Sequence, residues 1–111
     1  RVVISSSWRW DRSLENMKRL MTANGGEDLA GRIVGATPKL RHTIYAGSRQ
    51  IECEAWLQAN GLSEMAWLAL DDMPELFEAE TPHFYRVDAR CGLVDADVTR
   101  ISAFLQNFAC R

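Results

Sequence analysis

The sequence predicts one α/β domain in which helices lie on the faces of a mainly parallel sheet. Two observations support this prediction: short apolar runs alternate with helical patterns along the chain, and the runs at residues 2–4 and 65–70 are not interrupted by polar residues. Such runs are typical of strands buried on both faces, and alternating strands and helices imply right-handed crossovers between parallel strands. The length of 111 residues suits a single domain, which we place at residues 1–111.

Composition narrows the class of protein. The chain is 47% hydrophobic and 25% charged, with a formal net charge of −2, which excludes a binder that works only through a global positive field. No apolar run approaches the roughly 18 residues of a membrane span, and no signal-peptide pattern opens the chain. The cysteines Cys53, Cys91 and Cys110 have no close pair, which favours reduced thiols. We therefore expect a cytoplasmic protein without a membrane partner.

The chain begins with a predicted strand and a predicted helix. Val2-Val3-Ile4 is a short β-branched run that ends at Ser5-Ser6-Ser7. A helix is expected from Ser13 or Leu14 to about Ala23, where Asn24-Gly25-Gly26 stops it. Its apolar face is expected to contain Leu14, Met17, Leu20 and Met21.

The middle of the chain has a weaker strand, a loop and a second helix. The strand is Ile33-Val34, and residues 39–47 have the mixed polarity of a loop. The helix is expected to start near Ser48 as its N-cap and to end at Asn60-Gly61. Its expected apolar stripe consists of Ile51, Ala55, Trp56 and Ala59.

The last third has two predicted strands and a helix. Residues 65–70 form the clearest buried strand and stop at Asp71-Asp72, and a shorter strand covers residues 84–87. A final helix begins near Asp95. Its helical stripe consists of Val98, Ile101, Phe104, Leu105 and Phe108.

Polar groups follow two of these strands, and ligands of parallel sheets bind at the carboxyl ends of strands. Hydroxyls and backbone N–H groups in Ser5-Ser6-Ser7 suit phosphate oxygens, and Asp71-Asp72 suits Mg²⁺. Arg49, in the first turn of the second helix, is the best-placed cation for a phosphate. From the residues alone, each of these groups also has a structural explanation without a ligand. The serines can form a turn, the two aspartates can form another turn, and Arg49 can be a surface residue.

In this order, the elements resemble haloacid dehalogenase-superfamily phosphatases. The run Val2 to Arg9 is similar to the family's second motif, with Ser6 as the phosphoryl-binding residue and Ser5 as its main rival. Arg49 is similar to the third motif, and Asp71-Asp72 is similar to the Asp-Asp form of the fourth. Five blocks along the chain also resemble a subgroup associated with RNA-repair proteins. These blocks are Ser-Ser-Trp-Arg, Gly-Ala-Thr-Pro, Arg-Gln-Ile-(x)4-Trp-Leu, Leu-Asp-Asp and Cys-Gly-Leu.

The resemblance implies a three-layer Rossmann-like fold and an Mg²⁺-dependent phosphatase that works through an aspartyl-phosphate. Ser6 and Arg49 would be catalytic, Ser7 would also bind phosphate, and Asp71 and Asp72 would hold Mg²⁺. The phosphorylated substrate would be a small molecule or a nucleic-acid end.

The family's first motif, the Asp-x-Asp that carries the nucleophile, has no counterpart before Val2. We therefore expect the usual first strand to be missing, either because this chain is a fragment or because the chemistry is lost. Asp95-Ala96-Asp97 matches the Asp-x-Asp pattern. Asp95 as an N-cap and Asp97 in the first helical turn explain both aspartates without a catalytic role. An inactive binding module and a phosphate-binding regulatory domain are the alternatives. An open strand position would also suit an oligomer or a strand-swapped partner.

Overall fold

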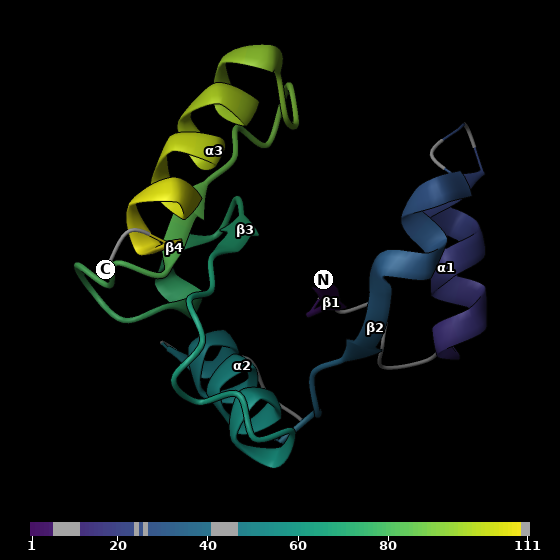
Figure 1. Cartoon of the computed structure of the whole chain (residues 1–111), viewed down its shortest axis with the longest axis horizontal. Coiled ribbons are helices and arrows are strands. Elements are labelled where there is room, and N and C mark those ends of the chain that lie inside the picture. Colours follow the sequence, from purple (N-terminus) through teal and green to yellow (C-terminus); the bar gives the residue numbers. More distant parts are fainter. Residues whose placement is uncertain (6–11, 24, 26, 41–46, 110–111) are drawn as a thin grey trace.

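The computed structural model describes residues 1–5, 12–23, 25, 27–40 and 47–109, and the side chains of residues 108 and 109 are not described. The β-structure of this part consists of two separate two-stranded sheets, both parallel. In Figure 1 the two strand pairs stand apart, and α2 (Ser48–Ala59) lies at the foot of the space between them. The parallel direction of the strands is as predicted. The single three-layer sheet is not seen in the described residues.

The first strand pair joins β1 (Val2–Ile4) to β2 (Ile33–Ala36). The backbone N–H of Thr37 donates to the carbonyl of Ile4 at 2.9 Å and extends the ladder beyond β2. Both predicted strands are confirmed, and β2 continues two residues beyond Val34 because Gly35 and Ala36 pair with Val3 and Ile4. The 3₁₀ helix η2 (Glu27–Arg32), which the sequence analysis did not predict, leads into β2.

The core of this half lies between the strand pair and α1 (Leu14–Thr22). The Ser13 side chain caps the helix by accepting from the N–H of Asn16 at 3.2 Å, as the predicted helix start requires. Met17 is only 2% exposed and packs with Ile4 and Ile33. Leu20 and Met21 are 49% and 41% exposed, so the predicted apolar face is only half buried. The small two-stranded sheet explains this, because it covers only part of the helix.

Helix α2 buries polar side chains rather than the predicted apolar stripe. Its N-cap is Gly47, with φ +76°, instead of Ser48, which is the first helical residue. The predicted apolar stripe is wrong at Ile51 and Ala59, because both residues are exposed. Trp56, which also belongs to the predicted stripe, is partly buried and packs against Gly35 of β2. The buried positions lie in the first turns: Ser48, Arg49, Gln50, Glu52 and Cys53. The start of the helix is therefore turned toward polar strand ends.

The second strand pair joins β3 (Ala69–Asp71) to β4 (Phe84–Arg86) in register, with Asp71 beside Arg86. Residues 65–68 are not in a strand, and Leu70 is 44% exposed, so the predicted buried strand is wrong in its length and burial. Only three residues of β4 are available for pairing, which limits β3 to the same length. The 3₁₀ helix η3 (Pro74–Leu76) follows β3 and packs on α2.

The last element is α3 (Asp95–Ala109), which begins where the sequence predicts. The hydroxyl of Tyr85 on β4 donates to the Asp97 carboxylate and joins the helix to the second strand pair. The predicted stripe is incompletely covered, because Val98 and Leu105 are 56% and 44% exposed. No helix in the described residues is long and apolar enough to cross a membrane.

Candidate active site

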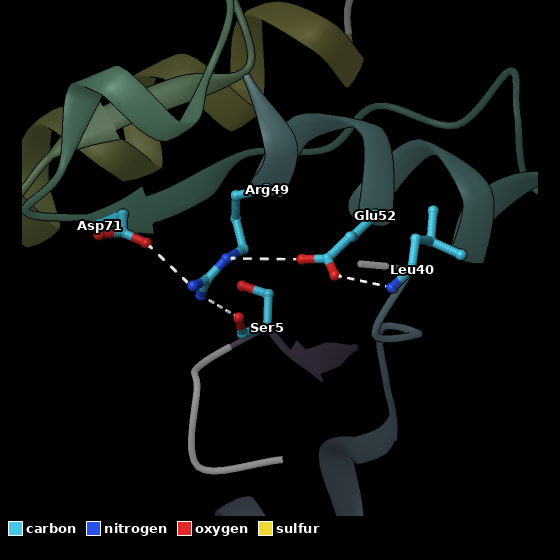
Figure 2. Close-up of polar contacts among 5 residues, drawn as sticks. All are labelled: Ser5, Leu40, Arg49, Glu52 and Asp71. Atoms are coloured by element: carbon cyan, nitrogen blue, oxygen red, sulfur yellow. Dashed lines mark hydrogen bonds and ion pairs between the residues drawn. The ribbon is translucent and has the colours of Figure 1, made fainter. Parts of the chain in front are cut away.

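The Arg49 side chain connects the carboxyl ends of the two strand pairs. Its Nη1 donates to the carbonyl oxygen of Ser5, which directly follows β1. The same nitrogen lies 4.0 Å from Oδ2 of Asp71, the last residue of β3 (Figure 2). The Arg49 side chain is 7% exposed. Two segments that are far apart in the sequence therefore meet at one buried guanidinium.

A second acidic side chain lies against the same guanidinium. Nε of Arg49 is 3.8 Å from Oε1 of Glu52, one helical turn further along α2. The other carboxylate oxygen of Glu52 accepts from the backbone N–H of Leu40 at 3.1 Å, as Figure 2 shows. Glu52 thus holds the segment after β2 against the start of α2. Within the described residues, this one guanidinium therefore lies between two carboxylates.

Asp71 is the better-buried member of the predicted metal pair, with a side chain that is 16% exposed. Its Oδ1 accepts from the N–H of Met73 at 2.9 Å, which fixes the carboxylate at the end of β3. Burial raises the pKa of Asp71 above its ordinary value, and a hydrogen bond with the Asp72 carboxyl raises it further. The Met73 N–H and Arg49 lower the pKa, but they do not offset burial. A bound cation would relieve this penalty.

Asp72 follows directly and is exposed. Among the described residues, no group of three or more His, Cys, Asp or Glu side chains could hold a metal ion. In this part of the chain, Asp71 and Asp72 are two adjacent carboxylates and not a closed metal cage. This donor set fits Mg²⁺, which is commonly held by one or two carboxylates while keeping water and phosphate oxygens as its other ligands.

The structure brings together some of the predicted site residues. Arg49 and Asp71 are in contact range, and Asp72 is adjacent to Asp71. Ser6 and Ser7 lie outside the described residues, although Ser5 places the start of their segment beside Arg49. Glu52 was not predicted from the sequence as a site residue. Its spacing of three residues from Arg49 on a predicted helix was the available signal.

The Asp95-Ala96-Asp97 pattern lies at the start of α3 and not at a strand end. Asp97 accepts from the Tyr85 hydroxyl at 2.5 Å and from the N–H of Val94 at 2.9 Å. The hydrogen bond from Tyr85 is the main reason that the pKa of Asp97 lies below its ordinary value, and the Val94 N–H adds to it. Asp97 therefore acts as a capping residue at this helix start.

The order of these elements, together with the Arg49–Asp71 contact, can be compared with known families. A sequence model of the family described as "HAD domain in Swiss Army Knife RNA repair proteins" matches residues 1–98. The chain belongs to this family. No curated protein and no solved structure matches the chain.

Membership confirms the resemblance that the strand-end motifs predicted, including its RNA-repair subgroup. It covers β1 through the first residues of α3, so both strand pairs and α2 belong to the HAD domain. The individual roles of Ser6, Ser7, Arg49, Asp71 and Asp72 stay predictions.

Proposed function

We propose that this HAD domain forms the binding half of an Mg²⁺-dependent phosphatase active site for phosphate monoesters. The observation that supports this proposal most strongly is the position of Arg49 between Ser5 and Asp71. A cation and a carboxylate at neighbouring strand ends are the two kinds of group that a phosphate and its counter-ion require. Membership of the HAD family supports the same reading.

Each residue would have a separate task. Asp72, with Asp71, would hold Mg²⁺, which screens the phosphate charge when it is bound. Arg49 would stabilise negative charge on the equatorial phosphoryl oxygens while keeping the two strand ends together. Ser6 would donate its hydroxyl to a phosphoryl oxygen, and Ser7 would add a second donor from the same segment.

The chemistry also needs a nucleophile. In the proposed reaction an aspartate oxygen attacks phosphorus, and the P–O bond to the alcohol breaks as a second acid protonates the leaving oxygen. Water then hydrolyses the aspartyl-phosphate to release inorganic phosphate. The Asp-x-Asp of this chain lies on α3, with Asp97 engaged by Tyr85, so we propose that another segment supplies the nucleophile.

The strand pairs suggest where that segment would bind. Within the described residues, β1 pairs only with β2, and β3 pairs only with β4. Each pair therefore has an edge that a further strand can extend. A strand that ends beside Ser5 and Asp71 would bring its last residues to the Arg49 guanidinium. The segment could come from the same polypeptide or from a partner chain.

A catalytically inactive binding module is the second candidate. It is favoured by the burial of Arg49, which is 5% exposed as a residue and fully explained by a structural role between β1, α2 and β3. Such a module would retain the fold and the contact with Asp71 but would show no turnover when a nucleophile is supplied.

Hydrolysis of an aryl phosphate separates these candidates. The chain would be compared with a version that carries, ahead of Arg1, an apolar strand ending in Asp-x-Asp. A parallel strand needs a linker of about a dozen residues or more. We expect turnover only in the fusion and only with Mg²⁺, lost in EDTA, in Asp72→Asn and in a control fusion ending in Asn-x-Asn.

Two outcomes would count against the proposal. A folded fusion that binds Mg²⁺ but shows no turnover would favour the binding module. Turnover by the unfused chain that disappears in Asp95→Asn or Asp97→Asn would place the nucleophile on α3 and contradict the supplied strand.

A further inference from the structure

A pocket of about 370 Å³ opens where β3 and β4 end, with Asp72 in its wall. This volume is within the usual range for sites that bind small molecules. Apart from Asp72, none of its residues has a part in the proposed phosphate site. The lining residues are Asp72, Arg86, Val87, Asp88, Ala89 and Arg90.

The backbone around this pocket is held by specific hydrogen bonds. The N–H of Val87, a lining residue, donates to the carbonyl of Asp71 at 2.8 Å, which joins the pocket to the end of β3. The chain then turns, with the N–H of Gly92 donating to the carbonyl of Asp88 at 2.8 Å. Gly92 has φ +65°, a conformation that glycine adopts without strain. The position of residues 88–92 relative to Asp71 is therefore defined.

The pocket lining carries two guanidinium groups, those of Arg86 and Arg90, and two carboxylates, those of Asp72 and Asp88. Asp88 uses Oδ1 to accept from the backbone N–H of Arg90 at 2.7 Å, so part of its carboxylate is already engaged. In the part of the chain that the structure describes, no carboxylate lies within ion-pair distance of the Arg86 or Arg90 guanidinium. Both guanidinium groups line the same pocket, so an anion bound there can contact both. Phosphate accepts two hydrogen bonds at once from a guanidinium.

We propose that Arg86 and Arg90 bind a second phosphate group of the substrate. The inference rests on the proposed function, because Asp72 belongs both to the pocket and to the metal pair. The monoester to be cleaved would bind at Asp71 and Asp72, and a neighbouring phosphate would bind the arginines. The substrate class is then nucleotides with two phosphate groups. A free nucleoside bisphosphate and a terminally phosphorylated oligonucleotide share this chemistry.

The test measures binding by calorimetry in Mg²⁺, with inorganic phosphate, adenosine 5′-monophosphate and adenosine 3′,5′-bisphosphate as probes. We expect the chain to bind the bisphosphate about tenfold more tightly than the monophosphate, the effect of one charge-assisted contact. In the double variant Arg86→Gln/Arg90→Gln, the ratio of the bisphosphate affinity to the monophosphate affinity should fall close to one. Binding of inorganic phosphate should not change. Arg86→Lys/Arg90→Lys keeps both charges and should retain part of the ratio.

Arg100→Gln is a control for the loss of a guanidinium charge outside the pocket, because its side chain on α3 is 70% exposed and does not line the pocket. It should leave the ratio unchanged. A terminally phosphorylated dinucleotide separates the two sources: a larger gain for the dinucleotide than for the bisphosphate indicates an oligonucleotide end, and the reverse indicates a free nucleotide.

The outcomes separate this proposal from the proposed function. Suppose that inorganic phosphate binds with Mg²⁺ but the bisphosphate binds no more tightly than the monophosphate, or that the double variant still binds the bisphosphate more tightly. The pocket assignment is then overturned and the phosphatase site stands. If phosphate does not bind with Mg²⁺, the proposed function fails. Bisphosphate binding in EDTA then tests the pocket assignment separately. Binding by the wild type that is lost in the double variant supports the assignment, and no binding by the wild type overturns it.

Discussion

The Arg49 guanidinium lies beside two acidic side chains, Glu52 and Asp71, and beside the carbonyl oxygen of Ser5. A buried ion pair has a small net effect on stability, because the loss of hydration offsets most of the attraction. Removing only one partner is different, because it leaves the remaining charge buried without compensation. We therefore expect Arg49 to contribute to the stability of the fold in addition to its role in the proposed phosphate site.

Replacing Arg49 with methionine should lower the free energy of unfolding by about 3 kcal/mol, the cost of an uncompensated buried charge. Arg49→Lys keeps the charge but loses the fork of donors, so it should lose less. Urea unfolding followed by circular dichroism measures both. Arg100→Met, at an exposed ion pair, is the control and should change stability little. Equal stability of Arg49→Met and wild type would contradict the structural role of Arg49.

Asp97 gives a pH dependence with a defined sign. Hydrogen bonds from Tyr85 and Val94 lower its pKa in the folded protein. A lowered pKa stabilises the fold above the ordinary carboxyl pKa of about 3.9, and this contribution is lost as the pH falls through the folded value. The melting temperature of Asp97→Asn should therefore lie below that of wild type at pH 6, and the gap should close in strongly acidic buffer.

Asp95→Asn is the matched control for Asp97, because it removes the same charge from the same helical turn without removing the Tyr85 contact. Its melting temperature should follow wild type more closely at pH 6. A gap between Asp97→Asn and wild type that stays constant down to the acidic limit would show that the carboxylate is not the stabilising form.

At the scale of the elements, the packing of α2 on β2 depends on a missing side chain. A Cβ at Gly35 would lie 3.0 Å from Nε1 and 3.2 Å from Cζ2 of Trp56. These contacts are tight, so the indole must shift before alanine fits. This helix also carries Arg49, so a shift of Trp56 would be transmitted to the candidate site.

Gly35→Ala should destabilise the protein by about 1 kcal/mol through overpacking. Gly31→Ala is the control, because a Cβ there meets nothing within 4 Å and Gly31 has no positive φ. Equilibrium denaturation of Gly35→Ala, Trp56→Phe and the double variant gives the coupling between the two positions. A smaller cost of Gly35→Ala in the Trp56→Phe background is expected. An unchanged cost would show that Trp56 is not the neighbour that opposes alanine.

The sequence predicted element types well where local chemistry decides them. Ser13 as a cap, the β-branched run at β1 and the start of α3 all follow from local preferences. Burial was harder to predict, because it depends on what packs against each face. Ile51 is exposed and Arg49 is buried, since the start of α2 faces polar strand ends that periodicity along one helix cannot indicate.

The same limit explains the candidate site. Arg49 and Asp71 are separated by 21 intervening residues, and only the rule for ligands at strand ends and the family resemblance suggested that they belong to one site. Glu52 and the arginine pocket at Arg86 and Arg90 were not predicted at all. Their significance depends on the register of β3 with β4 and on the turn after Val87, which single-residue preferences do not determine.

At the scale of the whole molecule, the described chain consists of two strand pairs whose carboxyl ends meet at Arg49. This arrangement places Arg49 beside Ser5 and Asp71 and, in the described residues, leaves strand edges for a further segment. In the proposed function binding and catalysis are separable, because we expect the chain to bind Mg²⁺ and phosphate before a nucleophile is supplied. The central claim is therefore about joint binding at the strand ends.

Calorimetric titration of inorganic phosphate into the chain, with and without Mg²⁺, tests that claim most directly. We predict that Mg²⁺ raises the phosphate affinity by about tenfold or more, since the cation screens the dianion. Asp72→Asn should remove this gain, and the control Asp95→Asn should keep it. Equal phosphate affinity with and without Mg²⁺ in a folded wild-type chain would contradict the account.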